Sequence, residues 1–304
     1  MQWVSDSATF RNLYTPELMH QIKNTCFVVL QHLLPQHALS RIMHSLTRNE
    51  TVWWKNLIIR QVVKRFKVNL AEAENPDIES YASFNKFFTR ALGPGARPLA
   101  QDVDIITSPA DGAISQIGVV QGAAILQAKG KIFTTEKLLG GSPGPSDLFN
   151  HGHFVTIYLS PRDYHRLHMP CDGVLKKMIH IPGQLFSVNS VTTESVDNLF
   201  ARNERVVAIF ETPLGAMALV LVGAIFVSSI ETVWHGVVTP PRSQSIRTWD
   251  YNDNPITLKR GQEMGRFNMG STIIVLFEKK QVQWLTSLSA GSTILMGEKL
   301  GSEI

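Results

Sequence analysis

Residues 263–277 read EMGRFNMGSTIIVLF, and the rest of the chain can be interpreted around them. The last five form a continuous apolar run with β-branched members, which predicts a buried strand. Gly265 and residues 268–270 predict a tight turn into that strand. Ser271 therefore stands at the mouth of the strand, behind the unshielded carbonyl of Gly270. A structural Gly-Ser turn is the ordinary interpretation, and attack of the Ser271 hydroxyl on that carbonyl is the chemical one.

The composition is that of a globular protein. The chain has 304 residues, of which 44% are hydrophobic and 18% charged, enough for one large domain or one domain with an extension. Residues 1–10 lack a basic stretch followed by an apolar one, so no secretory signal is expected. Residues 212–230 carry no charge, but Gly223 and the β-branched residues around it favour two short buried strands over a membrane-spanning helix.

Positive charge gathers at the front of the chain. Residues 1–70 hold nine Lys/Arg and three Asp/Glu, a balance of +6, whereas the whole chain is at +4 and the remainder therefore at −2 (4 minus 6). Such a basic segment suits an anionic surface, either a membrane or a nucleic acid. No recognised nucleic-acid motif accompanies the charge, so we expect no nucleic-acid partner.

Three helices are predicted in this basic segment. The first begins at the Thr15-Pro16-Glu17 cap and stops before Pro35, and the others cover 37–46 and 52–66. In the third, one face is apolar, and basic residues line its flank beside a tryptophan. The apolar face holds Val52, Ile59, Val62, Val63 and Phe66, and the flank holds Trp53, Arg60, Lys64 and Lys67. A helix lying in a membrane interface has this composition, and so does a helix packed on its own core.

The sequence pattern changes from helical to β-type near residue 95, where Gly93-Pro94-Gly95 marks a boundary. Short β-type runs separated by turns follow, at 114–120, 123–126, 153–159, 206–211, 216–222, 224–230, 273–277 and 281–285. Helices long enough for regular parallel crossovers are missing from this part. We therefore predict an α+β fold, with an N-terminal helical membrane-docking region at 1–95 and a β-rich, mixed or antiparallel catalytic body at 96–304.

Three groups in this body could act together. Asp111 lies in an Asp-Gly turn, and His165 and His168 lie between two prolines, where one helical turn would place both rings on a shared face. A carboxylate, an imidazole and the Ser271 hydroxyl are the parts of a relay, which is recognised by role rather than by chain order. Because Gly270 adjoins Ser271, the attack would be intramolecular and would gain a large effective concentration.

Metal chemistry is the main alternative for these histidines. His151 and His153 have an H-x-H spacing, which on a strand points both rings to one side, and with His165 and His168 they could serve a metal-dependent hydrolase. No nearby Glu or Cys completes a recognised site and the neighbours are basic, so we expect no metal. A non-enzymatic membrane-binding module, in which the Gly-Ser turn is structural, is the other alternative.

The order of short motifs along the chain resembles one family. They are SFNKFF (83–88), SPADG (108–112), LSPRDYHRLHMP (159–170), PGQLFSVN (182–189), NERV (203–206), ETVW (231–234), MGRF (264–267), GST (270–272) and GEKLG (297–301). Together they resemble the bacterial, prokaryotic-type phosphatidylserine decarboxylases, which are pyruvoyl-dependent enzymes of phosphatidylethanolamine biosynthesis. The family's usual Leu-Gly-Ser-Thr appears here with Met269 in place of leucine, which leaves the Gly-Ser bond intact.

The resemblance implies two reactions. In the first, Asp111 and His168 activate Ser271, and the chain cuts itself between Gly270 and Ser271 into a long chain (1–270) and a short chain of 34 residues (304 minus 270). Residue 271 becomes a covalent pyruvoyl cofactor. In the second, a Schiff base between that group and phosphatidylserine loses carbon dioxide, and His165 is the candidate for handling the proton.

The resemblance also implies where the protein works and with what. The two chains of one precursor would form a heterodimer, and a further homo-oligomer is compatible with the sequence. The acyl chains of phosphatidylserine stay in lipid, which implies a peripheral protein on the cytoplasmic face of the cell membrane. Arg60, Lys64 and Lys67 would attract the anionic lipid, each contributing about 1 kcal/mol near such a surface. A second Gly-Ser-Thr at 291–293 is disfavoured as the cleavage site because it would leave a fragment of only 13 residues (304 minus 291).

Overall fold

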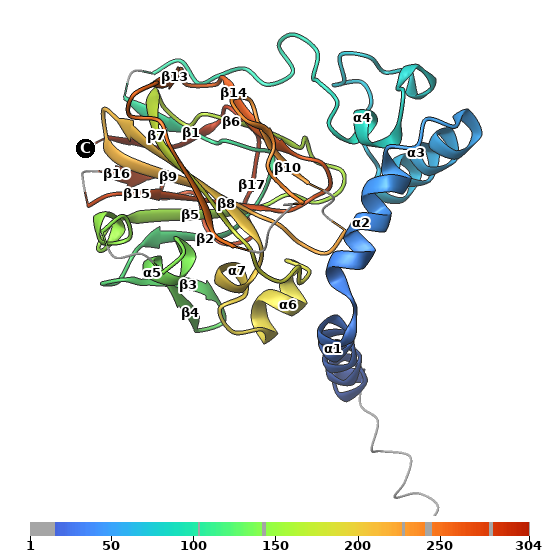
Figure 1. The fold of residues 1–304 in the computed structure, drawn as a ribbon, viewed down its shortest axis with the longest axis horizontal. Coiled ribbons are helices and arrows are strands. Elements are labelled where there is room, and N and C mark those ends of the chain that lie inside the picture. The colour runs from blue at the N-terminus through green and yellow to red at the C-terminus, as the bar shows by residue number, and fades with distance from the viewer. Residues whose placement is uncertain are drawn as a thin grey trace, which may run out of the picture.

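A computed structural model describes residues 16–102, 104–141, 144–226, 229–240, 245–279 and 282–303. It shows helices at one side of a body of mostly antiparallel sheets, which confirms the predicted α+β fold (Figure 1). The helices within these ranges are α1 (Pro16–Leu33), α2 (Gln36–Thr47), α3 (Val52–Phe66), α4 (Phe84–Phe88), α5 (Thr135–Leu138), α6 (Ser190–Ser195) and α7 (Leu199–Arg202), with 3-10 turns η1 (Ile78–Ser80) and η2 (Asp147–Phe149).

The three helices expected near the front of the chain are present as α1, α2 and α3. The cap expected at Thr15 lies outside the described residues. Helix α4 begins at Ser83, whose hydroxyl accepts a hydrogen bond from the Lys86 N–H at 3.3 Å. Its three phenylalanines are buried with Ile59 of α3 in a small separate core. This core joins α3 to α4, and α4 in turn reaches the β body.

The largest sheet runs through the body as nine strands within the described ranges. Its order is β12 (Arg247–Asp250), β7 (Gly173–Ile181), β8 (Arg205–Thr212), β9 (Gly215–Val222), β15 (Thr272–Phe277), β5 (His153–Tyr158), β2 (Gly112–Val119) and β17 (Thr293–Ile294), with β13 (Ile256–Leu258) also on β7. All of these pairs are antiparallel. The predicted strand at 273–277 is therefore confirmed as β15.

Three smaller sheets complete the described part of the body. They are β11 (Gly236–Val237), β10 (Ile230–Thr232), β14 (Glu263–Phe267) and β6 (Arg166–His168) in one; β1 (Ile105–Thr107), β18 (Lys299–Glu303) and β16 (Val282–Trp284) in another; and β3 (Ala124–Ala128) with β4 (Lys131–Thr134) in the third. Strands β14 and β15 follow one another in the chain but belong to different sheets. The four-residue connection between them therefore passes from one sheet to another.

Strand β15 lies at the centre of the main core. It pairs with β9 on one side and β5 on the other, and all six of its residues are buried. Burial of each large apolar side chain contributes about 1.5–3 kcal/mol, so this strand is among the most firmly held in the body. A continuous apolar run is what a strand covered on both faces requires.

The strand predicted at 224–230 is wrong. Residues 224–226 form no strand, and β10 begins only at Ile230. The Gly223 N–H donates to the Glu204 carbonyl, and the Asn203 side chain donates to the Gly223 carbonyl, both at 2.8 Å. The chain is thus captured at Gly223 and turns, with Phe226 in the left-handed region at a φ of 67°. Ala224 is buried without pairing in a sheet, which explains an apolar residue at this position.

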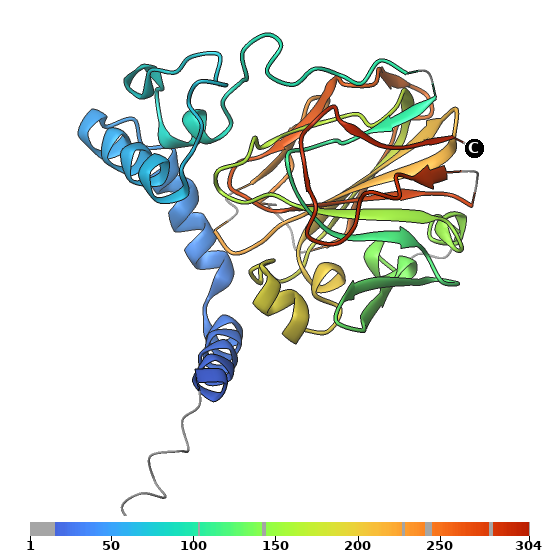
Figure 2. The ribbon, with the colours of Figure 1, turned by 180° about the vertical axis from the view of Figure 1, so that it is seen from behind.

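Large apolar side chains remain exposed on the N-terminal helices. Among the described residues they are Leu18, Met19, Ile22, Val29, Leu30, Leu33, Ile42, Leu46, Val52, Trp53, Leu57 and Phe66. Figures 1 and 2 show these helices projecting along one side of the β body, with α1 farthest from α4. Of the helices in the described ranges, none is both long enough and apolar enough to cross a membrane.

Candidate active site

The connection 268–271 is fixed at both ends by backbone hydrogen bonds. Before it, the Phe267 N–H donates to the His165 carbonyl at 3.0 Å, and after it, the Leu159 N–H donates to the Ser271 carbonyl at 2.8 Å. The peptide between Gly270 and Ser271 is therefore held in one place between two sheets. If it breaks, β14 and β15 each remain paired in their own sheet.

A polar network anchors the first residue of this connection. Asn268 is buried, and its backbone N–H and side-chain amide donate to the carbonyl and hydroxyl of Ser229 at 2.9 and 2.5 Å. The amide of Asn85 on α4 donates to the side-chain oxygen of Asn268 at 3.0 Å. Arg48, the residue after α2, donates to the Ser229 hydroxyl at 3.0 Å. The N-terminal helices thus help to fix the loop that carries Gly270.

Ser271 and His165 flank this peptide as buried and unsatisfied groups. Both are 0% exposed, and neither the Ser271 Oγ nor the His165 Nε2 has a hydrogen-bond partner among the described residues. A Cβ added to Gly270 would lie 3.1 Å from that Nε2, so the ring nitrogen abuts the Gly270 backbone. Orphaned polar atoms are rare in protein interiors, and two of them beside one peptide bond indicate a reactive site.

The surroundings of His165 keep its ring neutral. Nδ1 lies 2.8 Å from the Asp163 carbonyl, which places the proton on Nδ1 and leaves a lone pair on Nε2. The ring of Phe88 packs against it at a centroid distance of 4.1 Å, tilted by 42°. Burial lowers the pKa of His165 to about 3, although the bond to the Asp163 carbonyl opposes this shift.

His168 lies on the opposite side of the same extended segment. Its Nδ1 lies 2.8 Å from the Gly261 carbonyl and its Nε2 3.1 Å from the Tyr164 hydroxyl, so both ring nitrogens are engaged. Burial lowers the pKa of His168, and the Gly261 bond and the charges of Glu263 and Asp111 partly oppose this. Burial also raises the pKa of Tyr164 to about 12, which keeps its hydroxyl protonated and able to donate.

The shared helical face expected for the two histidines is wrong, because residues 166–168 form strand β6. In an extended chain, residues three apart point to opposite faces. Tyr164 and His168, four apart, accordingly meet on one face, while the His165 ring turns toward Gly270 on the other.

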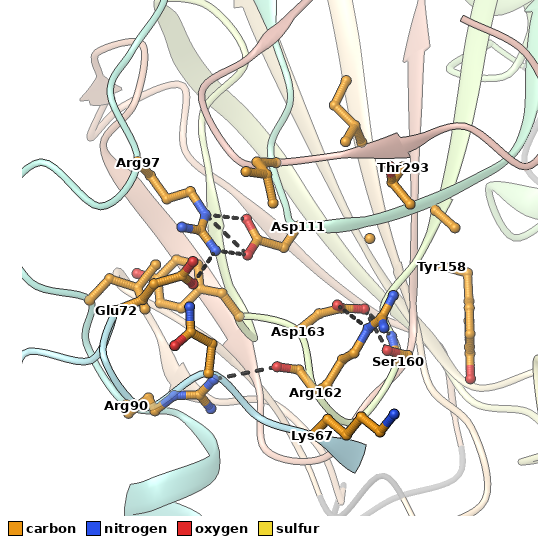
Figure 3. Close-up of a pocket in the computed structure, with 17 residues that line it drawn as sticks. Lys67, Glu72, Arg90, Arg97, Asp111, Tyr158, Ser160, Arg162, Asp163 and Thr293 are labelled. Atoms are coloured by element: carbon orange, nitrogen blue, oxygen red, sulfur yellow. Dashed lines mark hydrogen bonds and ion pairs between the residues drawn. The ribbon is translucent and has the colours of Figure 1, made fainter. Parts of the chain in front are cut away.

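Asp111 is held by an arginine that sequence reasoning missed. It is 3% exposed, and Arg97 donates to its two oxygens at 2.9 and 2.5 Å, while the Met296 N–H donates to it at 2.8 Å (Figure 3). Gly112 is required for close packing, since a Cβ there would lie 2.3 Å from the Tyr158 carbonyl oxygen. The His168 N–H donates to the Pro109 carbonyl at 2.9 Å, so His168 adjoins the turn that carries Asp111.

The structure therefore brings the predicted residues to one region but not into a hydrogen-bonded chain. His165 is the imidazole next to Gly270, His168 bonds to Tyr164, and Asp111 pairs with Arg97. Phe88, Tyr164 and Arg97 escaped sequence reasoning, although all three lie within or near the quoted motifs. In the described part of the chain, no group of three or more His, Cys, Asp or Glu side chains could hold a metal ion.

Comparison with known proteins adds to this geometry. A family model described as phosphatidylserine decarboxylase matches residues 84–302, and a second, described as PSD, matches 26–67. The phosphatidylserine decarboxylase proenzyme of Methylococcus capsulatus is 54% identical over 276 residues, which cover 91% of this chain and 96% of that protein. The proenzyme of Pseudomonas putida is 50% identical over 286 residues, which cover 93% of this chain and 99% of that protein. The proenzyme of Albidiferax ferrireducens is 51% identical over 276 residues, which cover 91% of this chain and 96% of that protein.

The class that the α+β fold and these matches define is a carboxy-lyase made as a proenzyme. The chain belongs to the phosphatidylserine decarboxylase family.

Proposed function

We propose that the protein converts phosphatidylserine to phosphatidylethanolamine with a pyruvoyl group that it makes from its own Ser271. The observation that carries this proposal is a pair of buried atoms beside the peptide after Gly270, Ser271 Oγ and His165 Nε2, for which the described part of the chain provides no hydrogen-bond partner. Family membership supplies the reaction class. The residues fit the cofactor because the hydroxyl that would attack the Gly270 carbonyl, and then leave with it as the carboxylate, is already sequestered from water.

The first reaction is self-cleavage. The Ser271 Oγ attacks the Gly270 carbonyl carbon, the C–N bond breaks, and an ester replaces the peptide while residue 271 gains a free amine. Elimination then releases Gly270 as a carboxylate and leaves a dehydroalanine at position 271. Water converts this residue to the pyruvoyl group and ammonia. The buried loop holds nucleophile and carbonyl together, which is the advantage of an intramolecular reaction.

We assign the base of this step to His168, with Asp111 as its charge partner. A base becomes positively charged when it takes the Ser271 proton, so nearby carboxylates favour it. Asp111 and Glu263 act in this sense on the pKa of His168, whereas Arg90 adds to the effect of burial in lowering that of His165. Because the His168 ring faces away from Gly270 in this structure, its Nε2 must leave the Tyr164 hydroxyl and the ring must turn to the Ser271 side of the segment before it can act.

We assign His165 to the decarboxylation. When bound to the substrate amine, the pyruvoyl group supplies a sink for the electron pair that departing carbon dioxide leaves. The substrate carbon that has lost its carboxylate must then be protonated. The His165 Nε2 abuts Gly270, next to residue 271, which places it to protonate that carbon. Because the neutral ring carries a lone pair on Nε2, that nitrogen must take up a proton before it can give one to the substrate carbon.

The two products of cleavage are proposed to stay together as a heterodimer of residues 1–270 and 271–304. The short chain would hold β15, β16, β17 and β18, of which β15 lies between β5 and β9, β17 pairs with β2, and β18 pairs with β1. These partners all belong to the long chain. Separation would expose the centre of the main core, so association is the stable state.

We further propose that the protein docks peripherally on the cytoplasmic face of the cell membrane through α1–α3. These helices combine the exposed apolar side chains with the basic residues of the front segment. Trp53, which is 67% exposed, is suited to the boundary between acyl chains and headgroups. The Arg60 guanidinium is engaged with Glu79 at 2.6 Å, which leaves Lys64 and Lys67 as the freer cations of that flank.

Replacing Trp53 by glutamate should weaken binding to vesicles that contain phosphatidylserine by about tenfold or more, because an apolar anchor is lost and a repelled charge gained. Flotation of the protein with such vesicles measures this. Val237 is a matched control, since it is 53% exposed but belongs to β11 and not to α1–α3. If Trp53→Glu and Val237→Glu float equally well, α1–α3 are not the docking surface.

The test of the proposed function combines intact mass with product analysis. The mature protein should contain a C-terminal fragment of 34 residues (304 minus 270) that begins with a carbonyl instead of an amine. The same material should release carbon dioxide from carboxyl-labelled phosphatidylserine. An active preparation consisting of one uncut chain would refute the proposal.

A further inference from the structure

A cavity of about 550 Å³ lies at the seam between the helical region and the β body. Its walls come from side chains within 67–97 on one side and from 111–113, 158–164 and 293–295 on the other (Figure 3). The volume suits a small polar ligand or a lipid headgroup. Asp111 lines it, so it adjoins the proposed reaction site.

The acidic side chains of this cavity already have partners. Asp111 and Glu72 both accept from Arg97, with Glu72 at 2.9 Å. Asp163 accepts from the N–H and hydroxyl of Ser160 at 2.7 and 2.8 Å. Of the cations that line the cavity, Arg97 is the one these bonds pair with two carboxylates.

Three cations of the cavity lack a strong carboxylate partner. Lys67 makes no ion pair with any residue in the described ranges, and Arg162 reaches Asp163 only at 3.6 Å with a side chain that is 61% exposed. Arg90 is 4% exposed, yet among the described residues its guanidinium donates to the Arg162 carbonyl alone, at 3.4 Å, and its Nε finds no acceptor there. In Figure 3 these three are drawn together below the Arg97–Asp111 pair.

One of these cations is held at a cost in folding energy. Arg90 is buried with an Nε that has no acceptor within the described ranges, so it lacks the compensation that a buried charge needs. An anion in the cavity would supply that acceptor. Lys67 is exposed and closes α3 as an ordinary left-handed C-cap, whose N–H donates to the Val63 carbonyl.

We propose that this cavity binds a phosphate group, and that the group is the phosphodiester of the phospholipid substrate, with Lys67, Arg90 and Arg162 as its ligands. The inference rests on the proposed function for the identity of the lipid. Arginine and lysine are the usual partners of phosphate oxygens.

The position of the cavity fits the chemistry. Its wall includes Tyr158 and Ser160, and Leu159 between them donates to the Ser271 carbonyl. Asp163, another wall residue, holds the His165 ring through its carbonyl. In phosphatidylserine one oxygen and one methylene separate the phosphorus from the carbon that bears the amine. A phosphate held here would therefore be separated from residue 271 by this single wall.

The kinetic test uses the mature protein and phosphatidylserine dispersed in a neutral detergent, so that membrane charge plays no part. Lys67→Glu and Arg162→Glu should each raise KM about tenfold or more, because a charge-assisted hydrogen bond is lost, while self-cleavage stays normal. Arg65→Glu is the matched control. Arg65 is exposed in the last turn of α3, carries the same charge and does not line the cavity. Equal KM values for Lys67→Glu and Arg65→Glu would overturn the proposal.

A binding test needs no turnover. By calorimetry, glycerophosphoserine should bind the native protein about tenfold more tightly than inorganic phosphate does, and Lys67→Glu should abolish the difference. If inorganic phosphate binds as tightly, the cavity is a plain anion site and the proposed subsite is wrong. If neither probe binds a protein that releases carbon dioxide, the subsite also fails. A protein that binds glycerophosphoserine but releases no carbon dioxide from phosphatidylserine contradicts the proposed function and not the phosphate subsite.

Discussion

Replacing Ser271 by alanine should leave one uncut chain of 33.9 kDa that releases no carbon dioxide from phosphatidylserine. The change removes the proposed nucleophile beside the Gly270 carbonyl and, with it, the oxygen whose departure would leave the dehydroalanine that becomes the pyruvoyl group. Both proposed reactions therefore stop, and the loss of activity should be complete. A denaturing gel and an intact mass measure the first effect, and labelled carbon dioxide measures the second. The circular dichroism spectrum should match that of the native protein, because a buried methyl group replaces an unbonded hydroxyl.

The second Gly-Ser-Thr of the chain supplies the matched control. Ser292 is partly exposed, and its Oγ accepts from the Ser289 N–H at 3.0 Å, so this serine is satisfied where Ser271 is not. Ser292→Ala should mature into two chains and decarboxylate normally. Cleavage of Ser271→Ala after Gly270, or an uncut Ser292→Ala, would show that the nucleophile is assigned wrongly.

The elements that local pattern could predict are those whose burial is uniform along the chain. Residues 273–277 are apolar throughout because β15 is covered on both faces, and the sequence displays this directly. Helix α3 was likewise readable from its periodicity. The turn after Gly223 was not readable, since it depends on hydrogen bonds between Gly223 and residues 203 and 204, which lie about 20 positions earlier in the chain. An apolar run that is buried without pairing looks like a strand until such contacts are known.

The same division applies to the candidate site. Asp111, the two histidines and Ser271 carry functional groups that composition can single out. Their partners are distant in sequence: Phe88 packs against His165, and Arg97 binds Asp111. Nothing in the local pattern indicates that an arginine will neutralise the relay carboxylate or that a phenylalanine will keep an imidazole dry. The number of residues between His165 and His168 was informative only once the segment was known to be extended.

The two histidines should separate the two reactions. His168→Ala should slow self-cleavage by about 100-fold or more, the usual contribution of a general base, whereas His165→Ala should cleave but decarboxylate at least about 100-fold more slowly. Time courses on a gel measure cleavage, and labelled carbon dioxide from matured protein measures turnover. If His165→Ala remains uncut while His168→Ala matures, the ring that abuts Gly270 is itself the base and the roles are reversed.

The pH dependence of self-cleavage tests the assignment of His168 independently, because only its neutral form can accept the Ser271 proton. Burial lowers the pKa of His168 below its ordinary value of 6.5, so the neutral form persists as the pH falls through that value. Self-cleavage should therefore run at full rate at pH 7 and decline only at a pH below 6.5. A rate that already falls between pH 8 and pH 7 would require a base with a raised pKa, which neither histidine has.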